Sequence, residues 1–342
     1  MANMKDLAKA TGLSLATISR VFNDSDKVTA QTREIVLSAA EKLSYRPNKM
    51  AAALRSGRSN SIGVIVPVID REVFSSAIKS MEEVLSASGY NIIICQSHES
   101  YQREQEIIEN LVQLKVAGVI ISISKETNTT DHLAVLEKEN IPLVFFDRSL
   151  ELGKLNSVVI NNYNGAYQAT QHLVDQGCRQ IIHLAGKEKV PIFRERRRGF
   201  EDALRRNKLA LEDGDVIAFD ESQANRVAQL TARLAAEPRP DGILAHGDIS
   251  ALVALRVLNE KGIRVPAEVA IVGFGDSLFC TYLEPGLSSV SQRNEDVGRL
   301  AASLLLEELQ PQEADRVVAH QVLPPVLKIR KSSLRRPQTT DE

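Results

Sequence analysis

Apolar and polar positions follow two different patterns, which divide the chain near residue 60. Residues 1–46 show helical spacing without strand-like runs, whereas short apolar strands alternate with amphipathic helices from Ser61 onward. Repeated strand–helix units predict parallel sheets with helices on both faces. About a dozen strands exceed one comfortable sheet, so we expect two lobes. The fold class is therefore α/β, an all-α headpiece followed by two doubly wound parallel sheets.

The expected elements are read from this periodicity. The strands are expected at 62–68, 91–96, 116–124, 143–147, 157–161, 180–185, 242–246, 269–273, 314–323 and 327–330. Helices are expected at 75–88, 102–114, 165–176, 196–206, 225–236, 249–261 and 296–309.

A helix-turn-helix pattern covers residues 4–23. Ala8 is a small residue where two helices can touch, Gly12 permits a positive φ in the turn, and Ile18 locks the second helix onto the first. Ser14 is placed to cap the second helix. The other core positions are Met4, Leu7, Leu13 and Val21. A third helix over 30–43 should close this core with Ile35, Val36, Ala39, Ala40 and Leu43.

The opposite face of the second helix is short and polar. Ala16, Arg20 and Asn23 point away from the core, with Thr17 and Ser19 on the flanks. Such a face fits a major groove, where arginine pairs bidentately with guanine. The alternative is a helical hairpin whose polar face simply meets water.

Charge favours nucleic acid as a partner. Residues 1–60 carry ten Lys or Arg against five Asp or Glu, a net of +5. The other residues hold 32 basic and 39 acidic groups, a net of −7. A basic end on an acidic body suits DNA contact, although charge alone also fits a solvated basic domain.

The next segment indicates a short helix and a linker. Pro47 interrupts any continuous helix, Asn48 can cap a new one that runs to Leu54, and 56–60 is a linker. Ile-Ser-Arg-Val-Phe-Asn at 18–23, Thr32-Arg33, Tyr-Arg-Pro-Asn at 45–48 and Ala-Ala-Ala-Leu at 51–54 resemble the LacI/GalR family of bacterial repressors. The resemblance extends to about residue 333.

This resemblance implies a DNA-bound hinge helix that pairs with its twin in a homodimer. Leu54 matches the leucine that enters the minor groove and kinks the duplex. Leu15, Ala16 and Arg20 match the base-reading positions, and Arg20 is the strongest candidate for operator specificity. The expected DNA-contacting residues are Ser14, Leu15, Ala16, Thr17, Ser19, Arg20, Asn23, Asn48, Ala51 and Leu54.

In the body, a ligand is expected at the carboxyl ends of the strands, in the cleft between two lobes. Polar groups follow several strands there, and the resemblance implies a periplasmic-binding-protein-like body with a sugar cleft. Arg196, before Gly199-Phe200, matches a family arginine, and Asp147-Arg148 resembles a pair common in sugar-sensing members. The expected effector-binding residues are Arg71, Phe74, Asp147, Arg148, Asn161, Arg196, Asp248 and Asp276.

Each candidate has a structural alternative. Asp147-Arg148 could be an ion pair within the protein, Asp248 could cap the following helix, and His246 fits a packed residue at a strand end better than a catalyst. Arg71 replaces a small polar residue of the family, which suits either an anionic sugar derivative or plain exposure. Gly275 stands where the family often has aspartate, and Asp276 is the candidate substitute.

The expected domains are 1–46 for the headpiece, 47–60 for the hinge helix and linker, and 61–333 for ligand binding and dimerisation. The resemblance implies three crossovers, so the first lobe comprises about 61–160 and 292–323, and the second about 161–291 and 324–333. The tail, 334–342, is expected to be disordered.

Other classes fit less well. Nucleotide-binding and hydrolase motifs are absent, histidines lack metal spacing, and we expect no enzyme, cofactor or metal. A solute-binding protein would carry a secretory signal instead of a DNA-reading module. Cys95, Cys178 and Cys280 read as buried reduced thiols in a cytoplasmic protein.

We therefore expect a transcriptional repressor that binds a palindromic operator as a homodimer. Its operator affinity should respond to a small effector, a sugar or a sugar acid or phosphate. Purine-type effectors also occur on this scaffold. Whether the effector releases or strengthens DNA binding, and whether target genes are repressed or activated, stays open.

Overall fold

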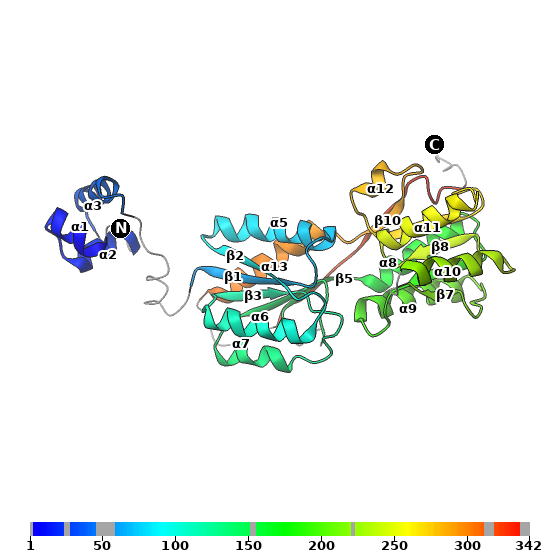
Figure 1. The fold of residues 1–342 in the computed structure, drawn as a ribbon, viewed down its shortest axis with the longest axis horizontal. Coiled ribbons are helices and arrows are strands. Elements are labelled where there is room, and N and C mark those ends of the chain that lie inside the picture. Colours follow the sequence, from blue (N-terminus) through cyan, green and yellow to red (C-terminus); the bar gives the residue numbers. More distant parts are fainter. Residues whose placement is uncertain are drawn as a thin grey trace. The chain divides into compact units, whose positions relative to one another are not determined.

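The computed structural model describes residues 3–23, 28–45, 59–150, 155–219, 223–310 and 318–335. The chain divides into two compact units, Met1–Ser59 and Asn60–Glu342, here called the headpiece and the body (Figure 1). The short helix expected at 48–54, with Asn48, Ala51 and Leu54, lies outside the described residues.

The headpiece contains three helices, α1 (Met4–Thr11), α2 (Leu15–Asn23) and α3 (Ala30–Lys42). Asn3 and Asp6 form a reciprocal capping box at the start of α1. Gly12 ends α1 in the left-handed region at φ +71°, as predicted. The Ser14 hydroxyl accepts a hydrogen bond from the Thr17 backbone N–H at 3.1 Å, which confirms the predicted cap of α2.

The headpiece core forms largely at the predicted positions. Its buried residues are Leu7, Ile18, Val21, Val36 and Ala40. The prediction was wrong for Ile35 and Leu43, which are 46% and 38% exposed. Only one stripe of α3 faces α1 and α2, so apolar neighbours just off that stripe stay at the surface.

The body contains two six-stranded sheets. The first has the order β11-β5-β4-β3-β1-β2 and is parallel throughout. Its strands are β1 (Ser61–Val66), β2 (Asn91–Gln96), β3 (Gly118–Ile121), β4 (Leu143–Phe146), β5 (Ser157–Ile160) and β11 (His320–Leu323). Each lies at a predicted position: the bounds of β2 agree, β1 begins one residue earlier than predicted, and β3, β4 and β5 are shorter. For β11, residues 314–317 of the predicted strand lie outside the described residues.

The second sheet has the order β12-β10-β9-β8-β6-β7. Its strands are β6 (Ile181–Ala185), β7 (Val216–Ala218), β8 (Gly242–Ala245), β9 (Ala270–Gly275), β10 (Ser288–Ser291) and β12 (Val326–Lys328). Strand β12 runs antiparallel to β10, so this sheet is not purely parallel as predicted. Strands β7 and β10 were not among the expected ones; β7 is short, and β10 is serine-rich and lacks an apolar run.

Helices cover both faces of each sheet (Figure 1). In the first lobe, α5 (Glu72–Ala87) and α13 (Asn294–Leu309) pack on one face, and α6 (Tyr101–Gln113) and α7 (Ala134–Lys138) on the other. In the second lobe, α8 (Asn162–Asp175) and α9 (Pro191–Arg206) oppose α10 (Gln223–Ala235) and α11 (Asp248–Glu260). Short helices η2 (Asp131–Leu133) and α12 (Phe279–Tyr282) complete the body.

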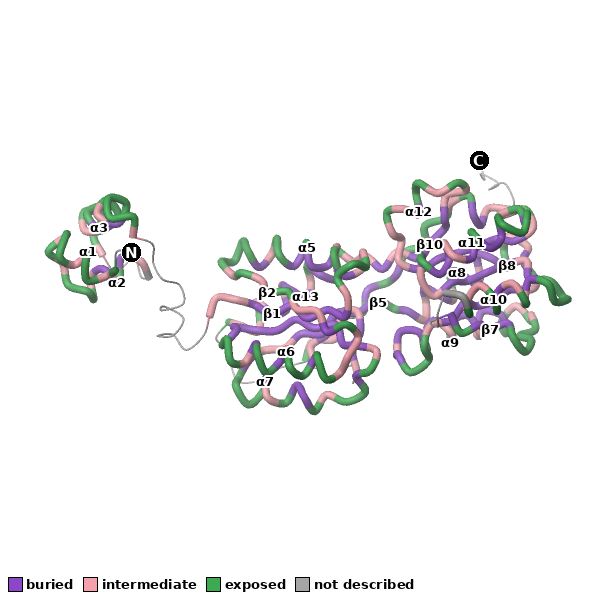
Figure 2. The backbone as a smooth tube through the Cα atoms, viewed as in Figure 1, coloured by how far each residue is buried: buried purple, intermediate pink, exposed green. Residues whose placement is uncertain are grey.

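Most strands are buried on both faces, and successive side chains point to opposite helical layers (Figure 2). Ile62, Val64 and Val66 of β1 join the core beneath α5 and α13. Ile65, on the opposite face of the same strand, joins the core beneath α6 and α7. One strand thus anchors two helical layers, which fixes its register.

The chain passes between the two sheets three times. It leaves the first sheet after β5, returns to that lobe with α13, and forms β11 before ending the second sheet with β12. These three segments therefore hold the ends of the sheets next to one another.

The remaining expectations can be compared with particular residues. Cys178 and Cys280 are buried free thiols, whereas Cys95 is only half-buried. Among the helices described, none has the length and apolar character of a membrane span. The tail was expected to be disordered from Leu334, but the Arg335 N–H donates to Gln176 Oε1 at 2.8 Å.

The α8–α9 pair depends on a close backbone approach at Gly199. A Cβ on Gly199 would collide with the Tyr163 carbonyl oxygen and lie 3.0 Å from the Tyr167 nitrogen. The obstacles are backbone atoms, which cannot rotate away. Gly199→Ala should lower the free energy of unfolding by about 2 kcal/mol or more.

Urea unfolding of the full chain measures this loss. Arg194→Ala is the matched control because Arg194 is an exposed residue of the same helix. An equal, small effect of both substitutions would contradict the close α8–α9 contact.

Candidate functional site

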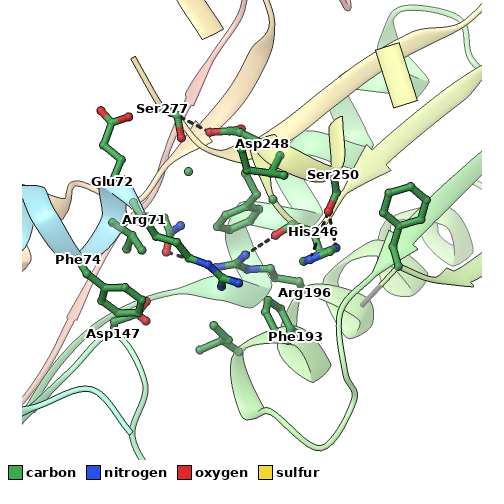
Figure 3. A pocket seen from close by; sticks show the side chains of 18 of the residues that line it. Arg71, Glu72, Phe74, Asp147, Phe193, Arg196, His246, Asp248, Ser250 and Ser277 are labelled. Carbon is green, nitrogen blue, oxygen red and sulfur yellow. Dashed lines mark hydrogen bonds between the residues drawn. The ribbon is translucent and has the colours of Figure 1, made fainter. Parts of the chain in front are cut away.

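A cavity of about 580 Å³ lies between the lobes, at the carboxyl ends of the parallel strands. Residues at the start of α5 enter it from the first lobe, and residues of α9 and around α11 from the second (Figure 3). The predicted residues that line it are Arg71, Phe74, Asp147, Arg148, Arg196 and Asp248. The structure therefore brings together six of the eight residues expected to bind the effector.

The first wall is the N-terminal turn of α5. Arg71 is the N-cap of this helix, but its side chain makes no capping hydrogen bond. Phe74 is fully buried and packs edge-to-face on Phe146, with ring centroids 6.3 Å apart. Glu72 Oε2 accepts a hydrogen bond from the Leu278 backbone N–H at 2.8 Å, which links the two lobes directly.

Asp147 and Arg148 follow β4. Arg148 Nη1 and Nη2 donate to the Glu99 carboxylate at 2.8 and 3.3 Å, and Arg148 Nε lies 3.8 Å from Asp147 Oδ2. Burial acts to raise the pKa of Glu99, but the charge and hydrogen bonds of Arg148 outweigh it and lower that pKa. The guanidinium group of Arg148 therefore binds mainly to Glu99, a partner that the sequence did not indicate.

Asp147 combines an uncommon backbone conformation with a buried carboxyl group. Its backbone has φ +57°, in the left-handed region that is uncommon for residues other than glycine, although aspartate enters it more readily than most. Burial raises the pKa of its carboxyl even though Arg148 and Arg196 act to lower it. The carboxylate lines the cavity, and its Oδ2 accepts a hydrogen bond from Ser122 Oγ at 3.4 Å.

Arg196 stands at the centre of the second-lobe wall and is 3% exposed. Its Nε donates to Asn162 Oδ1 at 2.8 Å, Nη1 to the His246 carbonyl at 2.6 Å, and Nη2 to Gln292 Oε1 at 3.3 Å. Its guanidinium lies 3.6 Å from the centroid of the Phe274 ring. Burial lowers the pKa of Arg196 to about 9, which leaves it charged at neutral pH.

Asp248 begins α11 and faces the same cavity. Its Oδ1 accepts from Ser289 Oγ at 2.5 Å and its Oδ2 from the Ser277 backbone N–H at 2.7 Å. No side-chain cap of α11 is formed, so the alternative reading of Asp248 as a helix cap is not supported. Instead, its carboxylate ties α11 to β10 and to the loop after β9.

The Gly-Phe-Gly run at 273–275 makes room for this carboxylate. A Cβ on Gly273 would collide with Asp248 Oδ1, and one on Gly275 would lie 2.8 Å from Oδ2. Gly275 also has φ +138°. An aspartate at 275, as the family often has, does not fit beside Asp248.

The two other predicted residues do not line this cavity. Asn161 caps α8 by accepting a hydrogen bond from the Asn164 backbone N–H at 2.9 Å, and its neighbour Asn162 holds Arg196 instead. Asp276 Oδ1 accepts from Arg330 Nη2 at 2.7 Å. Asp276 therefore secures the segment after β12 and does not substitute for a cleft aspartate.

Sequence reasoning missed most of the apolar wall. The additional lining residues include Val73, Lys125, Ile192, Phe193, Phe219, Arg226, Ile249, Ser250, Phe279 and Gln292. Several lie inside helices, where no strand end marks them. His246 also lines the cavity; its Nδ1 is 3.1 Å from the Leu184 carbonyl and its ring packs edge-on against Phe193.

In the headpiece, α2 presents the predicted face. Ser14, Leu15, Ala16 and Arg20 are exposed, and Thr17 and Ser19 are half-buried. The side chain of Asn23 lies outside the described residues. Among the described residues there is no group of three or more His, Cys, Asp or Glu suited to a metal ion.

A helix-turn-helix unit joined to a bilobed body with a cleft defines a ligand-responsive DNA-binding regulator. Two family models match this architecture: "Bacterial regulatory proteins, lacI family" over residues 3–48, and "Periplasmic binding protein-like domain" over residues 170–333. A "Ribose operon repressor" of Halalkalibacterium halodurans is 31% identical over 318 residues, 92% of each chain. The chain belongs to the lacI family of bacterial regulatory proteins.

Solved structures are similar over almost the whole chain. A lac repressor dimer bound to operator and the anti-inducer ONPF has a TM-score of 0.85 at 28% identity, covering 97% of this chain and 99% of that one. A complex of the transcriptional regulator CelR with cellobiose has a TM-score of 0.71 at 28% identity, covering 97% and 100%.

The cavity geometry predicts the effect of restoring the common aspartate. Gly275→Asp should place a second carboxylate against Asp248, whereas Gly275→Asn imposes the same backbone strain without the charge. The aspartate variant should be less stable than the asparagine variant at pH 7 by about 1.4 kcal/mol or more, the equivalent of one pKa unit.

The stability difference between the two variants should depend on pH. Repulsion raises the pKa of one carboxyl in the folded state, so on acidification the folded protein takes up a proton before the unfolded chain does, and the difference disappears as the pH falls from about 5 to about 4. Urea unfolding at about pH 7 and about pH 4 measures it. Equal stability of the two variants at pH 7 would show that the carboxylates do not meet.

Proposed function

We propose that this protein is a repressor that binds palindromic operator DNA as a homodimer and responds to a sugar or sugar derivative bound between its lobes. The observation that carries the proposal is the cavity around Arg196, to which both lobes contribute side chains. A ligand held by both walls stabilises one arrangement of the lobes over others.

The DNA-binding half rests on α2. Its exposed face places Arg20 beside the small side chain of Ala16, which allows close approach to base edges. The lac repressor similar to this chain is bound to operator as a dimer. By analogy, we propose that two α2 helices occupy successive major grooves and that Leu54 of each hinge segment enters the minor groove between them.

The effector half rests on the chemistry of the cavity. The rings of Phe74, Phe193, Phe219, Phe274 and Phe279 provide an apolar wall, and Asp147 provides an acceptor. Sugars present apolar C–H faces and hydroxyl donors, which match these two features. The related CelR structure holds cellobiose. Nucleobases are the second candidate, since flat rings also pack on phenylalanine.

Coupling between the two sites follows from the lobe arrangement. An effector that contacts the start of α5 and the Arg196 wall would change the relation between the lobes, and in a dimer this would alter the spacing of the two headpieces. The proposed binding to chromosomal operator DNA supports a cytoplasmic location for the protein.

Arg20 is the residue with which to test operator readout. Arg20→Gln should weaken binding to the specific operator by about 1–3 kcal/mol because a bidentate contact with guanine is lost. Binding to unrelated DNA should change far less. Electrophoretic mobility shifts on both DNA sequences at one salt concentration measure the two affinities.

Arg33→Gln serves as a control, since Arg33 lies on α3 and outside the proposed reading face. An equal loss of affinity for the specific operator and for unrelated DNA would mean that Arg20 contacts a phosphate and does not read a base.

Arg196 is the residue with which to test the effector cleft. Thermal unfolding of the protein against neutral sugars, sugar acids, sugar phosphates and nucleobases should first reveal a stabilising compound. At a hundred times its dissociation constant, such a compound adds about 2.7 kcal/mol. Arg196→Met should abolish this stabilisation and the effector's influence on operator binding, while operator affinity without effector persists.

Arg194→Met is the matched control on the same helix, because Arg194 is exposed. Arg196→Lys retains a positive charge in case the methionine variant is poorly folded. A full effector response in both Arg196 variants would place the effector elsewhere.

A further inference from the structure

The acidic and basic side chains of the cleft differ in how many partners they have within the protein. The cavity is lined by Asp70, Glu72, Asp147 and Asp248 on the acidic side. Its cations are Arg71, Lys125, Arg148, Arg196 and Arg226. We propose that the effector carries an anionic group, a carboxylate or a phosphate, which Arg71 of the first lobe and Arg226 of the second bind together. This inference rests on the proposed function and specifies the ligand class of the same cleft.

Two arginines on opposite walls have unused donors. Arg71 is exposed at the start of α5, and among the described residues no carboxylate forms a close ion pair with it, although its charge acts on Asp147. Arg226 approaches the Phe219 ring at 6.0 Å, and its Nε is buried without a hydrogen-bond acceptor in the part of the chain that the structure describes. A buried guanidinium N–H without an acceptor is costly, and an anion would satisfy it.

The acidic groups, in contrast, are largely satisfied within the protein. Both oxygens of Asp248 accept hydrogen bonds, and Glu72 accepts one from Leu278. Asp147 lies next to Arg148 and accepts a hydrogen bond from Ser122 at 3.4 Å. Three of the four acids are therefore engaged within the described part of the protein, whereas Asp70 is exposed. Arg71 and Arg226 are the cavity guanidinium groups whose charge is left for an anion.

Arg148 is another cavity arginine with a nitrogen that has no hydrogen-bond acceptor among the described residues. It is 2% exposed, and its Nε has no hydrogen-bond acceptor among the described residues, although Glu99 occupies its two other nitrogens. The Arg148 side chain also lines the cavity. An anionic oxygen near the start of α5 would have this donor within the same wall.

The ends of the cleft helices favour the same charge. The N-cap residues of α5 and α11 are Arg71 and Gly247, and neither makes a side-chain capping hydrogen bond, although Glu72 and Asp248 lie in the first turns. Both N-terminal turns line the cavity. Uncapped N–H groups at a helix start carry partial positive charge, which stabilises an anion. Together with the phenylalanine wall, these features fit a small sugar acid or sugar phosphate better than a neutral sugar.

Isothermal titration calorimetry on the full chain tests the inference with matched probes. D-gluconate and D-glucose 6-phosphate are each compared with D-glucose, and D-ribose 5-phosphate is compared with D-ribose. An anionic probe should bind at least about tenfold more tightly than its neutral counterpart, a difference of about 1.4 kcal/mol. Whether gluconate or a phosphate binds distinguishes the two anion sources.

The variants Arg71→Gln and Arg226→Gln should each weaken that anionic probe by about tenfold or more, and added salt should weaken it as well. Arg103→Gln is the control, since Arg103 is exposed on α6 and does not line the cavity. Its affinity for the probe should equal that of the unaltered protein.

Equal affinity for charged and neutral probes, with no effect of Arg71→Gln or Arg226→Gln, overturns the anionic class. If Arg196→Met still abolishes that binding, the proposed function stands without it. Failure of every anionic probe to bind also overturns the inference. Operator binding by the same preparation then shows separately whether the DNA-binding function holds.

Discussion

Burial of the Arg196 guanidinium constrains the geometry of the whole second-lobe wall. A buried charge is tolerated only when its donors are satisfied and opposite charge is near. Arg196 meets this requirement through Asn162, the His246 carbonyl and Gln292, which come from the start of α8, the end of β8 and the segment after β10. Three separate parts of the chain must therefore be correctly placed before this arginine can be buried.

The buried charge of Arg196 also links the two lobes electrostatically. Asp147 follows β4 of the first lobe, yet its charge acts on Arg196 and that of Arg196 acts on Asp147. The direct hydrogen bond between lobes at the start of α5, from Leu278 to Glu72, involves exposed groups and contributes little on its own. A ligand that bridges the lobes thus acts on an interface held by modest forces, where a few kcal/mol of differential binding suffice to shift the population.

The sequence predicted the fold well because strand and helix periods are local. It also predicted that Asp147 and Arg148 face a cleft, since parallel strands end at one edge. It could not distinguish Asn161, a helix cap, from Asn162, which holds Arg196, because adjacent residues differ only in side-chain direction. The partner of Asp276 is Arg330, 54 positions away, and no local pattern announces such a pair.

The glycine at 275 shows how such distant constraints govern the cleft. As a departure from the family pattern, Gly275 predicts a replacement acid, and Asp276 is the nearest one in sequence. The structure instead gives the space to Asp248, whose carboxylate closely approaches the backbone at 273 and 275. Because both Asp248 oxygens are engaged by Ser277 and Ser289, this acid organises the second lobe more than it offers acceptors to a ligand. In the proposed mode of binding, recognition by the second lobe then depends chiefly on arginines, and the charge of their guanidinium groups is the property that selects the effector.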